Sequence, residues 1–262
     1  GPDSGVPVIF LNHLAAVLDN WDPRVVDGIA AKHPVVTFDG PGVGASQGRA
    51  PETVADMARD AIAFIDGLGF TEVDLLGFSL GGFVAQEVVR QKPASVRRII
   101  LAGTGPAGGE GIDKVTGVTI SDSVMATLVR KDPKENLFFT KTANGKAEGR
   151  RFIQRLKERT ADRDKPISPS AFRRQLKAVR NWGTQEPFDL TGITQPVFVA
   201  NGDHDRMVPT SNSTDLARRL PNARLRIYPD AGHGGIFQHY RSFVPEVLEF
   251  LADDADPTRK HS

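Results

Sequence analysis

Short apolar runs alternate with longer amphipathic stretches along the first hundred residues of the chain. Runs rich in β-branched and aromatic residues, each bounded by turn residues, predict buried strands at 8–11, 35–38, 73–78 and 98–102. Apolar side chains that recur at helical spacing predict helices at about 52–68 and at 80–91. This alternation is typical of a mostly parallel sheet with crossover helices on both faces, so the predicted fold class is α/β.

The alternation stops between residues 104 and 187, where no buried strand is predicted. Polar helices are predicted there at 121–130, 147–160 and 168–179. The strand pattern resumes at 197–200 and 225–228, and a last helix follows at 243–251. We therefore predict one α/β core in two parts, 1–103 and 188–262, with a helical cap or lid at 104–187 inserted between them.

The inserted segment is basic, in a chain whose net charge is only +1. Residues 146–180 carry twelve Lys and Arg against four Asp and Glu. Two interpretations stay open, a solvated helical face and a lid that attracts an anionic or polar substrate. The balanced total charge gives no reason to expect a nucleic-acid partner.

Cysteine is absent, which excludes disulfides, thiolate metal sites and a cysteine nucleophile. Its absence fits a reducing cytoplasm, and no signal peptide is apparent at the start of the chain. No run approaches the roughly 18 apolar residues that would propose a membrane span. We therefore expect a cytoplasmic protein that acts on a small molecule rather than on a membrane or nucleic acid. Self-association into a homo-oligomer is left open.

The segment Gly77-Phe78-Ser79-Leu80-Gly81 has the form G-x-S-x-G, directly after a predicted strand and directly before a predicted helix. A nucleophile elbow requires this context, because its tight turn lifts a serine hydroxyl clear of the sheet. Glycines are needed two residues to either side because side chains there would strike the neighbouring strand and helix. Ser79 is therefore the candidate nucleophile.

A serine hydroxyl needs a base, and the base needs an acid that orients it. His233 lies in a glycine-rich loop after the strand at 225–228, and Asp205 follows the strand at 197–200. The carboxyl ends of parallel strands share one edge of the sheet, so we expect these side chains and Ser79 to meet there. Asp203 is the alternative acid, although we expect it to fix the loop instead.

These motifs resemble those of the α/β-hydrolase superfamily over nearly the whole chain. The elbow from Gly77 to Gly82 is similar to that of small esterases and cofactor-free haloperoxidases or perhydrolases. The stretch from Asp39 to Ser46 resembles the family's D-x-x-G-x-G-x-S loop, and the Gly-Asp-x-Asp-x-x-Val-Pro stretch resembles its acid loop, with the acid at Asp205. The resemblance implies an α/β-hydrolase fold, a serine triad, and chemistry that needs no metal or organic cofactor.

The chain departs from the family at two places. The family carries His-Gly after the first of these strands, whereas this chain has Asn12-His13-Leu14. On the family pattern the N–H groups of Leu14 and Leu80 form the oxyanion hole, while His13 either fixes the loop or contacts substrate. The family also has a strand pair before residue 8. This chain has no room for it, so we expect further residues upstream.

Four residues are candidates for substrate contacts: His13, Phe78, Trp182 and Phe237. Plain core packing is the alternative for the three larger aromatic residues. The predicted function is a serine hydrolase that cleaves a carboxylic ester or lactone of a small molecule through an acyl-enzyme. Perhydrolysis or haloperoxidation and C–C bond hydrolysis use the same triad and stay open. A ligand-binding receptor on a hydrolase fold is the alternative of another class, although a pure binder needs no triad.

Overall fold

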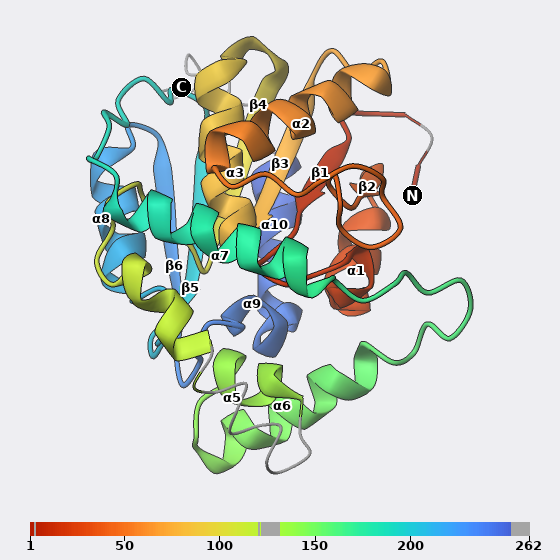
Figure 1. Cartoon of the computed structure of the whole chain (residues 1–262), viewed down its shortest axis with the longest axis vertical. Helices are drawn as coiled ribbons and strands as arrows, with labels where there is room; N and C mark the ends of the chain where they lie inside the picture. The colour runs from red at the N-terminus through yellow and green to blue at the C-terminus, as the bar shows by residue number, and fades with distance from the viewer. Residues whose placement is uncertain (3, 120, 122–131, 253–262) are drawn as a thin grey trace, which may run out of the picture.

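A six-stranded, all-parallel sheet forms the centre of the computed structural model, which describes residues 1–2, 4–119, 121 and 132–252 (Figure 1). The strand order is β2-β1-β3-β4-β5-β6. The strands are β1 Val8–Leu11, β2 Val35–Thr37, β3 Val73–Phe78, β4 Val96–Ala102, β5 Val197–Gly202 and β6 Ala223–Tyr228. The predicted α/β class is confirmed, and every predicted strand is present with small shifts at its ends.

The middle of the sheet is buried on both faces. Every residue of β1, β3 and β5 is buried, as expected for continuous apolar strands that helices cover on both sides. The edge strand β6 instead exposes Arg224, Leu225 and Arg226. Ser79 directly follows β3, so the candidate nucleophile lies at the end of a central, fully enclosed strand.

Helices cover both faces of the sheet. In the described residues they are α1 Pro23–Ala30, α2 Val54–Gly67, α3 Leu80–Gln91, α5 Pro133–Phe138, α6 Ala143–Arg155, α7 Pro169–Thr184, α8 Ser211–Arg219, α9 Gly235–Gln238 and α10 Tyr240–Ala252. α2 and α3 pack together in front of the strands in Figure 1, and α1 packs with α10 on the other face. None of these helices is long and apolar enough to cross a bilayer.

Two helices that the periodicity missed have clear start signals in the sequence. At α1, Asp22 Oδ1 accepts a hydrogen bond from Arg24 N at 3.0 Å, and Pro23 occupies the first helical position, where no N–H is needed. α5 begins in the same way at Asp132 and Pro133. Because these helices have only eight and six residues, their apolar pattern is too brief to be recognised.

The segment between β4 and β5 contains α5, α6 and α7, with no strand among its described residues. The helix predicted at 147–160 lies at Ala143–Arg155, and the one predicted at 168–179 is Pro169–Thr184. The helix predicted at 121–130 lies, apart from Ser121, outside the described residues. In Figure 1, α5 and α6 lie beyond the sheet on the side of α9, and α7 crosses in front of the core. The division into core and cap stays a prediction.

Arg155 joins the inserted segment to the core through a buried ion pair. Its Nε donates to Asp22 Oδ1 at 3.0 Å, and its Nη2 donates to Asp22 Oδ2 at 2.6 Å. Nη2 also donates to the Phe237 carbonyl at 3.1 Å. Burial raises the pKa of the Asp22 carboxyl, and the Arg155 guanidinium opposes that rise. The bidentate geometry fixes both the position and the orientation of α6 against the core.

Other basic side chains of the inserted segment also pair with carboxylates of the core. Arg159 Nη1 lies 3.0 Å from Asp19 Oδ1, and Arg174 and Lys177 both bind the Glu52 carboxylate. Part of the positive charge of residues 146–180 is therefore neutralised by carboxylates of the same chain. Neither a solvated face nor a lid that attracts an anionic substrate, the two interpretations of the sequence, included this role.

Two carboxyl groups face each other at a further contact between the core and the inserted segment. Asp39 follows β2 and Asp164 lies between α6 and α7, and their carboxyl groups flank Gly44, which has a φ of 58°. Burial, together with the neighbouring Asp164 carboxylate, raises the pKa of Asp39 to about 7. Below neutral pH the Asp39 carboxyl is therefore mostly protonated in the folded protein.

Replacing Arg155 by Met should lower the free energy of unfolding by about 3–5 kcal/mol, because the Asp22 carboxylate would stay buried without its partner. Urea unfolding monitored by circular dichroism measures the change. Arg151→Met is the matched control, since Arg151 lies on the same helix with an exposed side chain that pairs with Glu148 of that helix. An Arg155 variant no less stable than this control would show that the buried pair does not anchor α6.

Asp39→Asn should stabilise the protein at pH 8 and leave its stability near pH 4 almost unchanged. The folded-state pKa of about 7 lies above the ordinary aspartate value of about 4, so the free energy of unfolding falls as the pH rises between these two values. Asparagine imitates the protonated carboxyl and removes that slope. Urea unfolding across pH 4–8 tests this, and a difference from wild type that is independent of pH would contradict it.

Candidate active site

Ser79 lies on a strained turn between β3 and α3. Its φ is 56° and its ψ is −117°, a region that costs a residue with a side chain about 1–3 kcal/mol. The turn is held by hydrogen bonds from Ser79 N to the Ala102 carbonyl at 2.9 Å and from Thr104 Oγ1 to the Ser79 carbonyl at 2.8 Å. A strained serine at the start of a helix is the backbone geometry that the sequence motif predicts.

The glycines around Ser79 are required by close backbone contacts. A β-carbon on Gly77 would strike the Gly81 carbonyl, and one on Gly81 would strike the Leu11 carbonyl at the end of β1. A β-carbon on Gly82 would collide with the Thr104 side chain. The first turn of α3 therefore lies directly against the ends of β1 and β3, which is possible only without side chains at these positions.

His233 and Asp205 form a buried hydrogen-bonded pair at the carboxyl edge of the sheet. His233 Nδ1 donates to Asp205 Oδ2 at 2.7 Å, and both side chains are almost fully enclosed. Asp205 Oδ1 accepts hydrogen bonds from Met207 N at 2.8 Å and Val208 N at 3.0 Å, so its orientation is fixed. Because a carboxylate only accepts hydrogen bonds, Nδ1 carries the proton and Nε2 is left with its lone pair.

The residue before Ser79 contacts the imidazole of this pair. The Phe78 ring, one residue before Ser79, lies 4.9 Å from the His233 ring. In the described part of the chain no hydrogen bond joins Ser79 Oγ to His233, a common state for a catalytic pair without substrate. Gly103, with a φ of 53°, lies so close to His233 Nδ1 that a β-carbon there would crowd the imidazole.

Asp203 fixes the backbone of the loop that carries His233. Its Oδ1 accepts from Ala231 N at 3.0 Å and its Oδ2 accepts from Asp230 N at 3.1 Å. The imidazole that Asp203 contacts is that of His204, at 2.6 Å. The geometry thus places Asp205 at His233 and Asp203 at the loop, as the sequence analysis expects.

The loop after β1 and the start of α3 each carry one of the predicted oxyanion donors, Leu14 and Leu80. Leu14 and Leu80 are both buried. Among the described residues, neither of their N–H groups donates a hydrogen bond, which is rare for buried backbone donors. His13 shapes this loop, since its Nδ1 donates to the Leu14 carbonyl at 2.8 Å. Two unused donors at the start of α3 and in the adjacent loop are suited to receive a negatively charged oxygen.

Aromatic rings enclose His13 and His233. The Phe78 ring lies 5.3 Å from the His13 ring and 4.9 Å from the Phe237 ring. Phe138 of α5, which the sequence analysis did not single out, contacts both histidine rings. Burial, followed by the charge of Lys134, lowers the pKa of His13 to about 3, so this imidazole is neutral at ordinary pH.

Trp182 lies in a different aromatic group from the other candidate contacts. It stacks on Phe83 of α3 at 5.4 Å, and its Nε1 donates to the Gly105 carbonyl at 3.3 Å. A role for Trp182, Phe78, Phe237 or His13 in substrate binding stays a prediction.

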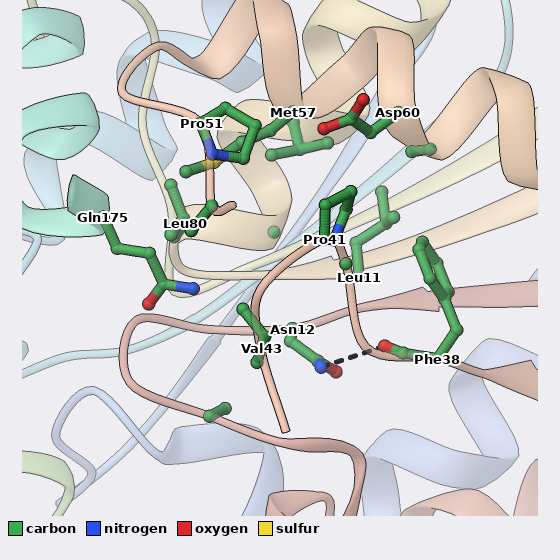
Figure 2. Close-up of a pocket in the computed structure, with 16 residues that line it drawn as sticks. Leu11, Asn12, Phe38, Pro41, Val43, Pro51, Met57, Asp60, Leu80 and Gln175 are labelled. Carbon is green, nitrogen blue, oxygen red and sulfur yellow. Dashed lines mark hydrogen bonds between the residues drawn. The ribbon is translucent and has the colours of Figure 1, made fainter. Parts of the chain in front are cut away.

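Asn12 occupies the position where the resemblance expects histidine, and it connects three segments of the core. Its Nδ2 donates to the Phe38 carbonyl at 3.0 Å and to Asp39 Oδ1 at 2.9 Å, while its Oδ1 accepts from Trp21 Nε1 at 2.7 Å. The first of these bonds is drawn in Figure 2. Asn12 therefore ties the loop after β1 to the loop after β2.

A mostly apolar pocket opens beside the first turn of α3 (Figure 2). It is bounded by Leu80, Asn12, Val43 and Met57 of the core and by Gln175 of α7. Among the residues that the structure describes, no group of three or more His, Asp or Glu side chains is arranged to hold a metal ion.

Comparison with known proteins gives the family of the chain. Residues 6–240 match the model of the alpha/beta hydrolase fold family. The solved structure of an alpha/beta hydrolase fold protein from Chitinophaga pinensis is similar, with a TM-score of 0.90 and 38% identity over 97% of this chain and 91% of that one.

Two curated relatives are similar along most of their length. The pimeloyl-(acyl-carrier protein) methyl ester esterase of Nitrosomonas europaea is 25% identical over 93% of this chain and 93% of its own. The non-heme haloperoxidase of Rhodococcus erythropolis is 28% identical over 95% of this chain and 93% of its own. These matches confirm the resemblance drawn from the sequence motifs, and with it the expectation of an enzyme. The chain belongs to the alpha/beta hydrolase fold family.

Proposed function

We propose that this enzyme is a serine hydrolase that cleaves a carboxylic ester or lactone of a small molecule. The observation that carries the proposal is the 2.7 Å hydrogen bond between His233 Nδ1 and Asp205 Oδ2, at the same sheet edge as the strained Ser79 turn. A similar protein named as a methyl ester esterase supports the ester specificity.

In the first half of the reaction, His233 Nε2 takes the proton of Ser79 Oγ as that oxygen attacks the substrate carbonyl carbon. Asp205 holds the imidazole in this tautomer and stabilises its charged form. The N–H groups of Leu14 and Leu80 receive the oxyanion. As the tetrahedral intermediate collapses, the ester C–O bond breaks and the leaving alkoxide takes the proton from His233.

In the second half, a water molecule gives its proton to His233 Nε2 and attacks the acyl-enzyme. The second tetrahedral intermediate collapses, the acid leaves, and Ser79 Oγ regains its proton from His233. Peroxide in place of water would yield a peracid by the same steps. The similar protein named as a non-heme haloperoxidase is the observation that keeps perhydrolysis as the second candidate. C–C bond hydrolysis has no such support here.

A fluorophosphonate probe should label Ser79 and no other residue, because only an activated serine reacts rapidly with it. Mass spectrometry of the digested protein locates the label, and Ser79→Ala is the control that should remain unlabelled. The same variant should lose ester hydrolysis by roughly 10⁴- to 10⁶-fold. Labelling elsewhere, or full turnover by Ser79→Ala, would rule out the proposed nucleophile.

Asp205→Asn should lower kcat by roughly 10⁴-fold, because the amide favours the wrong imidazole tautomer. Asp203→Asn, two residues away, is the matched control and should lower kcat less than about 10-fold while lowering the melting temperature, since it only fixes the loop. Steady-state kinetics with a p-nitrophenyl ester and thermal unfolding of both variants give the comparison. A larger kcat loss for Asp203→Asn would make Asp203 the acid.

A further inference from the structure

Gln175 is a polar residue on the buried face of α7. Ala171, Ala178, Val179 and Trp182 lie one or two turns from it on the same face, and all are buried. Gln175 itself is only 7% exposed. A buried side-chain amide destabilises the fold unless it is hydrogen-bonded. The partner of Gln175 therefore indicates why a polar residue occupies this position.

The partner of Gln175 is the backbone of the loop that carries Leu14. Gln175 Oε1 accepts a hydrogen bond from Ala15 N at 2.9 Å. Ala15 has a φ of 62°, a left-handed conformation that a residue with a β-carbon adopts only when its surroundings hold it there. Ala15 N belongs to the Leu14–Ala15 peptide, so this hydrogen bond fixes the peptide plane on the carboxyl side of Leu14, next to the plane that carries the Leu14 N–H.

The loop that carries Leu14 borders a pocket on the side of α7. Asn12 and Ala16, at the two ends of the loop, line the pocket of Figure 2 together with Leu80. Figure 2 shows the Gln175 side chain reaching from α7 into this pocket towards the loop. The loop itself is buried, with Leu14 7% and Ala16 1% exposed, and on its pocket side the Gln175 amide binds its backbone.

The helix that presents Gln175 is itself firmly attached to the core. Arg174, the preceding residue, binds both the Ala50 carbonyl and the Glu52 carboxylate. Two turns further on, Asn181 Nδ2 donates to the Glu52 carbonyl at 3.2 Å. α7 therefore presents Gln175 from a fixed position, which a group that sets a catalytic geometry requires.

We propose that Gln175 is a positioning residue that aims the Leu14 N–H at the developing oxyanion, by holding Ala15 in its left-handed conformation. The inference rests on the proposed serine hydrolase function. It gives one residue of α7, in the inserted segment, an indirect part in catalysis. It also places the effect of Gln175 in the transition state, where the oxyanion forms, rather than in the binding of the uncharged substrate.

Three variants test the proposal with a p-nitrophenyl ester. Gln175→Met keeps the side-chain length but removes the acceptor, and should lower kcat by roughly 10- to 100-fold with KM changed less than about 3-fold. Gln175→Glu keeps an oxygen for Ala15 N and should recover most of that loss. Thr184→Ala is the matched control, because it removes a hydrogen bond within α7, from Thr184 Oγ1 to the Arg180 carbonyl, that reaches neither the loop nor the core, and it should leave kcat unchanged.

Inhibition by an aryl trifluoromethyl ketone, which forms a tetrahedral oxyanion on the serine, should weaken in Gln175→Met in proportion to the fall in kcat. Equal kcat and equal inhibition in Gln175→Met and wild type would overturn the inference. Rapid hydrogen exchange of the Ala15 amide in the wild-type protein would also overturn it, whether or not the variant folds. A wild-type protein without ester hydrolysis or Ser79 labelling would instead refute the proposed function.

Discussion

The close approach of α3 to the ends of β1 and β3 is the constraint on which the site depends. Without side chains at Gly77 and Gly81, the first turn of α3 lies directly on the strand ends, and the chain reverses at Ser79 with a φ of 56°. This contact sets the Leu80 N–H beside the loop after β1. It also orients the sheet edge at which the Asp205 and His233 loops end. The candidate nucleophile, its candidate base and the proposed oxyanion donors are thus related through backbone geometry.

Opposite charges attach the inserted segment to this core. In the buried pair of Arg155 with Asp22 and in the contacts of Glu52 with α7, the segment supplies the cations and the core supplies the carboxylates. Arg24 of the core and Glu158 of the segment pair in the opposite sense. The exception is the acid pair of Asp39 and Asp164, where burial and proximity favour a shared proton. The basic character of residues 146–180 therefore has a structural use, which does not require an anionic substrate.

The sequence predicted the sheet well and pointed to a candidate triad, because both rest on local patterns. Apolar runs mark the strands β1, β3 and β5, whose side chains are all buried. The G-x-S-x-G motif predicts the backbone turn between β3 and α3 from five adjacent residues. The short helices α1 and α5 were missed because two turns give little periodicity. Their caps, Asp22-Pro23 and Asp132-Pro133, were the signals available. Phe138 was missed because nothing local distinguishes a phenylalanine that contacts two histidines.

By itself, the sequence determined the α/β class, the Ser79 turn and the loops that carry Asp205 and His233, since each depends on residues close together in the chain. Tertiary structure alone decided which cations meet the core and that Gln175 binds Ala15. That last bond joins residues 160 positions apart. Such hydrogen bonds and ion pairs form only between groups that packing brings within about 3 Å of each other. A local sequence pattern does not show which distant residues will come that close.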